Sequence, residues 1–172
     1  QFSQPVLNHL SQKTGSTALL GHITEDSVFV IAVSEGQKEI VISFRIGHRF
    51  DLTYGAHGIV IAAFTTENER QRILKNNPLY FYGDPDRLDP HRLGQDLARC
   101  RERGFAVDFG ELQTGITAIS APIAGPGGRL TGCIILVGLF TKADAHQFGS
   151  LVVESAGRIT QAAGGSPLTF GM

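Results

Sequence analysis

The sequence has 172 residues, of which 42% are hydrophobic and 18% are charged, and its formal net charge at pH 7 is −1. This composition is typical of a globular protein, and a chain so close to neutrality lacks the positive field that holds nucleic acid directly. No apolar run approaches the roughly 20 residues of a membrane span and the first residues do not resemble a secretory leader, so we predict a cytoplasmic protein without a membrane partner.

The chain begins with a predicted helix followed by three predicted strands. Ser3 as a cap and Pro5 in the first turn favour a helix start, and Gly15 favours the helix end. Three runs rich in β-branched residues come next, separated by short polar turns, which indicates an antiparallel meander. The predicted strands are residues 17–23, 27–33 and 38–44.

The middle of the chain is predicted to be mainly helical. Thr66 and Glu69 have the spacing of a capping box, and Asp89 with Pro90 is a further helix start that Gly104 stops. Proline and glycine residues before this last helix indicate a surface loop. The predicted helices are residues 56–64, about 66–75, and a third from 89 to the stop at 104, and the loop is residues 76–88.

The last third returns to strands and closes with a long helix. Residues 125–128 (GPGG) predict a turn between two strands, and Thr141 with Asp144 predicts the helix start. The predicted strands are residues 105–107, 115–123 and 130–139, and the apolar stripe of the final helix is Phe148, Leu151, Val152, Ala156 and Ile159. This order of elements predicts an α+β fold with about six antiparallel strands flanked by helices.

Three segments carry motifs in a fixed order. They are residues 46–58 (IGHRFDLTYGAHG), 103–111 (RGFAVDFGE) and 115–123 (GITAISAPI). The first is similar to a glycine-led loop that enters a helix, the second to "R-x-x-G-[YF]-x-x-D-x-x-E" and the third to "G-[VL]-x-x-[IV]-A-x-P-[IV]". Together they resemble the effector-binding C-terminal domain of the IclR family of bacterial transcription regulators, over nearly the whole chain.

The resemblance implies a GAF-like (profilin-like) domain that joins an N-terminal winged helix-turn-helix in the intact regulator. We therefore expect residues 1–172 to form a single effector-binding domain, with the helix at residues 1–14 near the interdomain linker. The sequence starts at Gln1 rather than Met, so it is interpreted as a fragment that reaches operator DNA only through the missing N-terminal domain. Regulators of this kind act as symmetric oligomers, so a homodimer or homotetramer is expected.

The sequence departs from the family pattern in and beside the expected pocket. Asp51 stands where the family usually has proline, Ile59 where it has lysine, and Ala118 where it often has cysteine. An alanine in place of cysteine would leave the cavity slightly roomier. These departures concern the choice of ligand more than the fold.

Gly55 and Ala56 stand where an irregular stretch enters the predicted helix at residues 56–64. Free backbone N–H groups and the positive end of the helix dipole would favour a carboxylate or phosphate there. Alternatively, the glycine only permits a tight turn and close packing. The resemblance favours the first interpretation, because family members place a small acid's carboxylate near the matching residues.

Asp108 could accept hydrogen bonds from the ligand, or it could hold a turn by bonding nearby backbone N–H groups. Ile116 and Ala118 share one face of a strand, and with Leu136 from the next strand they could line an apolar wall, although core packing explains them equally well. The predicted effector-binding residues are Gly55, Ala56, Asp108, Ile116, Ala118 and Leu136.

No residue pattern supports catalysis or metal binding. The six histidines lack ligand spacing, and only His57 is expected near the pocket. No nucleophile motif is present, and Cys100 and Cys133 in their apolar surroundings are expected as reduced core residues, with a disulfide between them left open. We predict no enzymatic activity, no metal and no cofactor.

The predicted function is therefore that of the effector-sensing and oligomerisation domain of an IclR-type regulator, which binds a small organic acid that modulates DNA binding. Two alternatives stay open. The chain could be a GAF-like small-molecule-binding or enzymatic domain unrelated to transcription, or it could be a purely oligomerising module.

Overall fold

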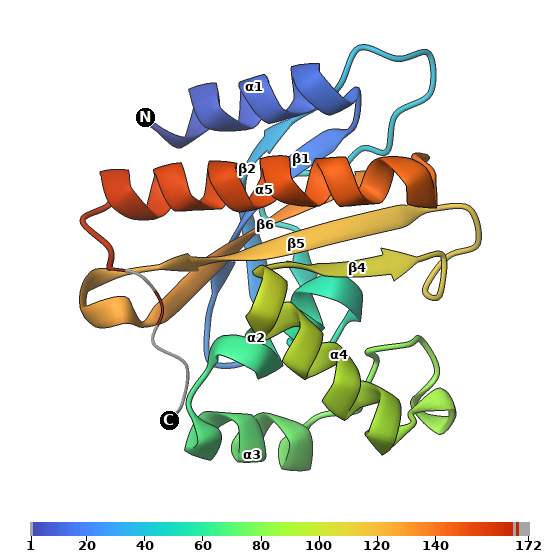
Figure 1. Cartoon of the computed structure of the whole chain (residues 1–172), viewed down its shortest axis with the longest axis vertical. Coiled ribbons are helices and arrows are strands. Elements are labelled where there is room, and N and C mark those ends of the chain that lie inside the picture. Colours follow the sequence, from blue (N-terminus) through green and yellow to red (C-terminus); the bar gives the residue numbers. More distant parts are fainter. Residues whose placement is uncertain (1, 167, 169–172) are drawn as a thin grey trace.

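The computed structural model describes residues 2–166 and 168, which form an antiparallel sheet between two layers of helices (Figure 1). The six strands lie in the order β3-β2-β1-β6-β5-β4, and every pairing is antiparallel. The strands are β1 (Thr17–Ile23), β2 (Val28–Ser34), β3 (Arg49–Phe50), β4 (Ala106–Phe109), β5 (Thr117–Ala124) and β6 (Leu130–Gly138). The predicted α+β fold class is confirmed.

Helices cover both faces of the sheet (Figure 1). On one face lie α1 (Ser3–Thr14) and α5 (Lys142–Ala162), side by side. On the other lie α2 (Gly55–Phe64), α3 (Glu67–Asn76) and α4 (Pro90–Arg103), and short 3-10 turns occupy Pro85–Arg87 and Pro126–Gly128. Among the helices of the described residues, none is long and apolar enough to cross a membrane.

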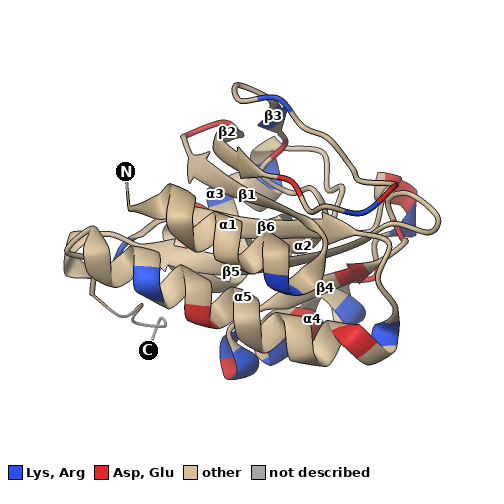
Figure 2. Ribbon diagram, turned by 90° about the horizontal axis from the view of Figure 1, so that it is seen from above, with Lys and Arg blue, Asp and Glu red and all other residues tan. Residues whose placement is uncertain are grey.

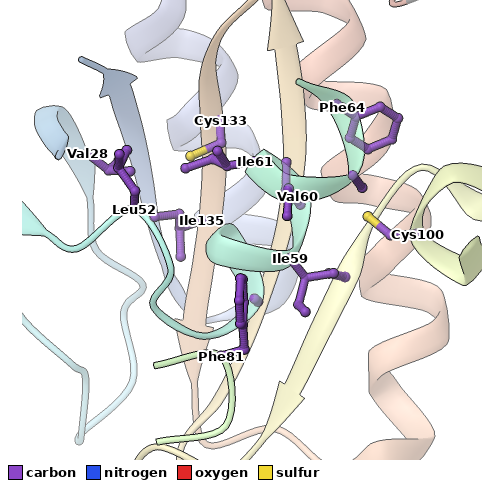
Figure 3. Close-up of a cluster of buried hydrophobic side chains, with 14 of the residues drawn as sticks. Val28, Leu52, Ile59, Val60, Ile61, Phe64, Phe81, Cys100, Cys133 and Ile135 are labelled. Atoms are coloured by element: carbon purple, nitrogen blue, oxygen red, sulfur yellow. The ribbon is translucent and has the colours of Figure 1, made fainter. Parts of the chain in front are cut away.

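The helix α2 is the centre of the core on its face of the sheet. All ten residues of α2 are buried, since its sequence GAHGIVIAAF holds no charged residue. Figure 3 shows α2 between Cys133 and Ile135 of β6 on one side and Cys100 of α4 on the other. No residue of this helix is therefore exposed to solvent on the protein surface.

Two arginines hold the carboxyl end of α2. Arg101 of α4 donates from Nε to the carbonyl oxygen of Ala63 at 2.9 Å, and Arg70 of α3 donates from Nη2 to the carbonyl oxygen of Thr65 at 3.1 Å. Positive side chains satisfy the unpaired carbonyls at a helix end and complement its partial negative charge. These bonds connect α2 to the two outer helices.

On the opposite face, α5 packs through the predicted stripe. Val152, Ala156 and Ile159 are buried, and Phe148 and Leu151 pack against the same cluster of side chains. Gly149 lies directly over the ring of Phe105: a Cβ atom there would lie 2.4 Å from Cζ of that ring. The predicted helix and its buried face are confirmed.

Three of the predicted helix starts are also confirmed, whereas the predicted cap at Ser3 is wrong, because Ser3 is the first residue of α1 and Phe2 before it provides no side-chain cap. Thr66 accepts a hydrogen bond from the backbone N–H of Glu69 at 3.2 Å, and Asp89 accepts bonds from the first turn of α4. Thr141 caps α5 by accepting from the N–H of Asp144. Each cap satisfies backbone donors that have no partner within the helix.

The predicted strand at residues 38–44 is wrong. The third strand is instead the two-residue β3, in which Phe50 lies opposite Val28 of β2. Residues 38–44 form an irregular segment whose Ile42 and Phe44 turn toward a cavity, while Ile40 is 69% exposed. The β-branched composition that indicated a strand belongs to a segment that covers the interior without pairing.

Candidate functional site

A cavity of about 500 Å³ lies against the sheet beside the amino end of α2. We call it the aromatic cavity. One wall comes from the sheet and from the residues just before β5, and it is apolar: Ile116, Ala118, Ile135 and Val137. The other walls come from residues 42–57, from Asp108 of β4 and from the turn after β4, which includes Leu112.

Five rings line the aromatic cavity. Phe50 is their centre: its ring centroid lies 4.6 Å from that of His48, 5.1 Å from that of His57 and 5.5 Å from that of Phe44. Tyr54 stacks on Phe50 at 5.9 Å. Edge and offset contacts at these distances are favourable, so the rings support one another in place.

The amino end of α2 reaches this cavity with unused donors. The N–H of Gly55 donates to the carbonyl oxygen of Tyr80 at 3.3 Å, and that of Gly58 donates to Tyr54 at 3.0 Å. Among the described residues, the N–H groups of Ala56 and His57 have no acceptor, and Tyr54 provides no side-chain cap. Both residues line the cavity, so two free donors and the positive helix end lie at its wall.

Gly55 itself lies outside the wall of the aromatic cavity, whereas the predicted Ala56 lines it. Gly55 adopts a φ of 56°, and a Cβ atom there would lie 2.4 Å from Cδ1 of Leu112. The tight-turn interpretation therefore describes this glycine, while its neighbour faces the space where a ligand would bind.

His57 is a buried, neutral ring. Its Nε2 lies 3.0 Å from the carbonyl oxygen of Asp51, and because a carbonyl only accepts, Nε2 carries the proton. Burial lowers the pKa of His57 to about 4. The ring therefore contributes an aromatic surface and no positive charge near neutral pH. His57 lies at the pocket as expected.

Asp108 both holds a turn and lines the cavity. Its Oδ1 accepts from the backbone N–H of Glu111 at 2.9 Å, so the turn interpretation is confirmed. The residue is 6% exposed, and burial raises the pKa of its carboxyl group. Burial and this carboxylate also raise the pKa of Tyr54 across the cavity.

Ile116 and Ala118 line the aromatic cavity, but Leu136 does not. In the β5–β6 pairing Ala118 lies opposite Val137, whereas Leu136 lies opposite Ile119. Side chains alternate between the two faces of a strand, so Leu136 points to the α1–α5 face and packs in that core. The prediction of Leu136 as a cavity residue is wrong by one position along β6.

Sequence reasoning missed the aromatic wall and the β6 residues Ile135 and Val137. The rings of the wall occur within residues 44–57, a clustering that is visible in the sequence, but the irregular backbone there follows no period. Register between β5 and β6 would have identified the β6 residues.

The described residues contain no group of three or more His, Cys, Asp or Glu side chains placed to hold a metal ion. Burial raises the pKa of both Cys100 and Cys133 to about 12, and both are free thiols. Such thiols stay protonated near neutral pH and do not act as nucleophiles.

The sequence matches the family described as "Bacterial transcriptional regulator IclR C-terminal" over residues 1–161. HTH-type transcriptional regulator BhcR of Paracoccus denitrificans is 31% identical over 157 residues, which are 90% of this chain and 56% of that protein. Transcriptional repressor IclR of Escherichia coli is 24% identical over 166 residues, with 94% of this chain and 61% of that protein covered. The chain thus spans little more than half the length of these relatives.

Solved structures of IclR-type regulators have the same fold as this chain. The crystal structure of Thermotoga maritima IclR superposes with a TM-score of 0.82 at 28% identity, covering 93% of this chain and 66% of that one. The C-terminal domain of the E. coli transcriptional regulator KdgR superposes with a TM-score of 0.77 at 22% identity, covering 94% and 96%, and this likeness concerns the fold alone. These relatives are named as regulators, and the expectation of a chain that is not an enzyme is confirmed. The chain belongs to the IclR family of bacterial transcriptional regulators and corresponds to their C-terminal domain.

Proposed function

We propose that this chain is the effector-binding domain of a cytoplasmic regulator and that its aromatic cavity binds a small organic acid. The observation that carries the proposal is the pair of free N–H groups, on Ala56 and His57, at the edge of a cavity that is lined mainly by aromatic and aliphatic side chains. Concave, mostly apolar pockets with a few convergent polar groups are the usual form of a small-molecule site.

The amino end of α2 supports an anionic group on the ligand. A carboxylate near Ala56 and His57 would accept two hydrogen bonds from donors that have no other partner, and it would complement the helix dipole. Asp51, Asp108 and Arg49 also line the cavity, and the two carboxylates outnumber the one guanidinium group and oppose a second negative charge. This combination favours a monocarboxylate.

The walls support a flat ligand body. The rings around Phe50 and the side chains of Ala118 and Val137 line the same cavity, so an aromatic acid would stack on the rings and contact the sheet. A ring hydroxyl group on the ligand could donate to Asp108. Within the range of aliphatic and aromatic acids expected from the sequence, these walls favour an aromatic one.

Isothermal titration calorimetry with benzoate, 4-hydroxybenzoate and butyrate tests the proposal. The aromatic acids should bind at least about tenfold more tightly than butyrate because they bury more apolar area. Ala118→Leu should weaken benzoate binding by about tenfold or more, since it fills the cavity. Ala143→Leu, which adds the same atoms at an exposed position on α5, should leave it unchanged. Absence of binding by any acid, or equal affinity in both variants, would contradict the proposal.

The bound acid is proposed to modulate DNA binding by a separate N-terminal domain of the regulator. The net charge of −1 gives this chain itself no field for phosphate backbones, so operator DNA would be reached only through that domain. Palindromic operators match two-fold protein symmetry, which supports assembly as a homodimer or homotetramer.

A further inference from the structure

A second cavity, of about 270 Å³, lies on the other side of Ala56 and Asp108 from the aromatic cavity. We call it the arginine cavity. It lies beside the edge strand β4, and basic residues from two helices line it: Arg92, Arg99 and Arg103 of α4, and Lys142 at the start of α5. Figure 2 shows charged residues gathered along α4, at the end of β4 and at the start of α5.

Three carboxylates line this cavity: Asp108 accepts from the backbone N–H of Glu111, and Glu111 and Asp96 contact other side chains. Glu111 forms ion pairs with Arg92 at 2.6 Å and with Arg87 at 2.9 Å. Asp96 accepts from the Tyr82 hydroxyl at 2.6 Å and lies 3.6 Å from Nε of Arg92. These contacts neutralise Arg92 and leave little acceptor capacity for the remaining cations.

Arg103 has no carboxylate partner within 4.0 Å among residues 2–166 and 168. Its Nε donates to the carbonyl oxygen of Phe105 at 3.0 Å, and its guanidinium group lies 4.2 Å from the centroid of the Phe105 ring. One bond and one stacking contact thus fix the group, while both Nη atoms stay available as donors. Burial lowers the pKa of Arg103, and the neighbouring charge of Arg99 lowers it further.

Lys142 and Arg99 add positive charge that is poorly compensated. Lys142 forms no ion pair with any described residue, and its Nζ lies 5.3 Å from the centroid of the Phe109 ring. Among the described residues Arg99 forms a single ion pair, at 3.9 Å to Asp96. Arg99, Arg103 and Lys142 thus bring three cations to one small, polar cavity. Within the described part of the chain, the three share only one ion pair, the long contact between Arg99 and Asp96.

We infer that the arginine cavity binds the phosphoryl group of a small metabolite. Planar guanidinium groups present paired N–H donors that match phosphate oxygens, and a dianion gains more from several nearby cations than a monoanion does. The cavity is about half the volume of the aromatic cavity and is walled by charged groups, which fits a compact polyanion better than an apolar body. The inference does not depend on the acid proposed for the aromatic cavity.

Isothermal titration calorimetry with inorganic phosphate, at ionic strength kept constant with sodium chloride, tests this inference. The wild-type chain should bind one phosphate saturably. Arg103→Gln and Lys142→Gln should each weaken binding by about fivefold or more, because each removes a cation. The matched control is Arg158→Gln, an exposed arginine of α5 outside the cavity, and it should not change the affinity.

Lys142→Gln keeps the test valid if Arg103→Gln loses stability with its contact to Phe105, since the Lys142 side chain is exposed and makes no hydrogen bond to the described residues. Ala118→Leu separates the two cavities, because it should weaken benzoate binding and leave phosphate binding intact. Phosphate binding that is absent in the wild type would overturn the inference. Equal phosphate binding by wild type, Lys142→Gln and Arg103→Gln would also overturn it, since it would indicate a general ion effect.

Discussion

Ala118 of β5 lies directly opposite Val137 of β6, and both side chains line the aromatic cavity. The next pair along the ladder, Ile119 and Leu136, is fully buried in the core of the opposite face. One residue along β6 therefore separates a position that shapes the proposed ligand site from a position that only stabilises the fold.

This alternation predicts different effects for neighbouring substitutions. Val137→Leu should weaken benzoate binding by about fivefold or more, because it extends into the cavity. Leu136→Val should lower the free energy of unfolding by roughly 1 kcal/mol, through lost burial, and leave the affinity unchanged. Urea unfolding and calorimetry measure the two quantities. A larger effect on affinity from Leu136→Val would show that the sheet is read in the wrong register.

His57 predicts a loss of stability in mild acid. Burial lowers its folded pKa from 6.5 to about 4, so between these values the unfolded chain binds more protons than the folded one. Stability should therefore fall as pH decreases from 6.5 toward 4, by up to about 3 kcal/mol from this group alone. Below pH 4 its contribution should not change further.

The measurement compares urea unfolding at pH 7 and pH 4.5 for wild type, His57→Gln and His146→Gln. His57→Gln should reduce the pH dependence, whereas the exposed control His146→Gln should keep that of the wild type. The opposite contribution of Asp108, whose pKa is raised, is common to all three proteins and cancels in the comparison. If the free energy of unfolding of His57→Gln changed with pH as much as that of the wild type, the assignment of His57 as a buried neutral ring would be contradicted.

Two glycines of α5 predict effects of opposite sign. Gly149→Ala places a Cβ atom against the Phe105 ring and should destabilise the protein by about 1–3 kcal/mol. Gly157→Ala meets no atom within 4 Å and should stabilise it by about 0.5–1 kcal/mol, since alanine favours a helix. Thermal unfolding of both variants checks this. Equal changes in Tm for the two variants would mean that α5 does not pack against Phe105 through Gly149.

Assembly is testable by sedimentation. If the regulator assembles as the proposed homodimer or homotetramer and its effector-binding domains supply only part of the contact, residues 1–172 should sediment as a monomer–dimer mixture. The dimer fraction should rise with protein concentration across the micromolar range. A strict monomer at every concentration would contradict a contact between these domains.

Local signals predicted much of the fold. The caps at Thr66, Asp89 and Thr141 form as their spacing indicates, because a cap involves only the side chain and the first turn of its own helix. Residues 38–44 show the limit of this reasoning. Their composition suits a strand, but a strand also needs a neighbouring strand with a free edge. The free edge of β2 is instead paired with β3, which follows later in the chain.

The residues of the candidate site that were predicted correctly are those that local motifs identify. Ala56, Asp108, Ile116 and Ala118 line the aromatic cavity, and the residues were found from motifs within single segments. The choice between Leu136 and Val137 depends on how β6 pairs with β5, which a single sequence does not contain. The rings around Phe50 converge only because irregular backbone folds back over the sheet.

The burial of α2 has a mechanical consequence. A helix with an exposed face can shift slightly by displacing water, but all ten residues of α2 are in contact with protein, and close-packed interiors transmit displacement instead of absorbing it. Its amino end borders both cavities, and its carboxyl end is bonded to Arg70 and Arg101. A shift of α2 that moves its carboxyl end would therefore act directly on α3 and α4 through these two arginines.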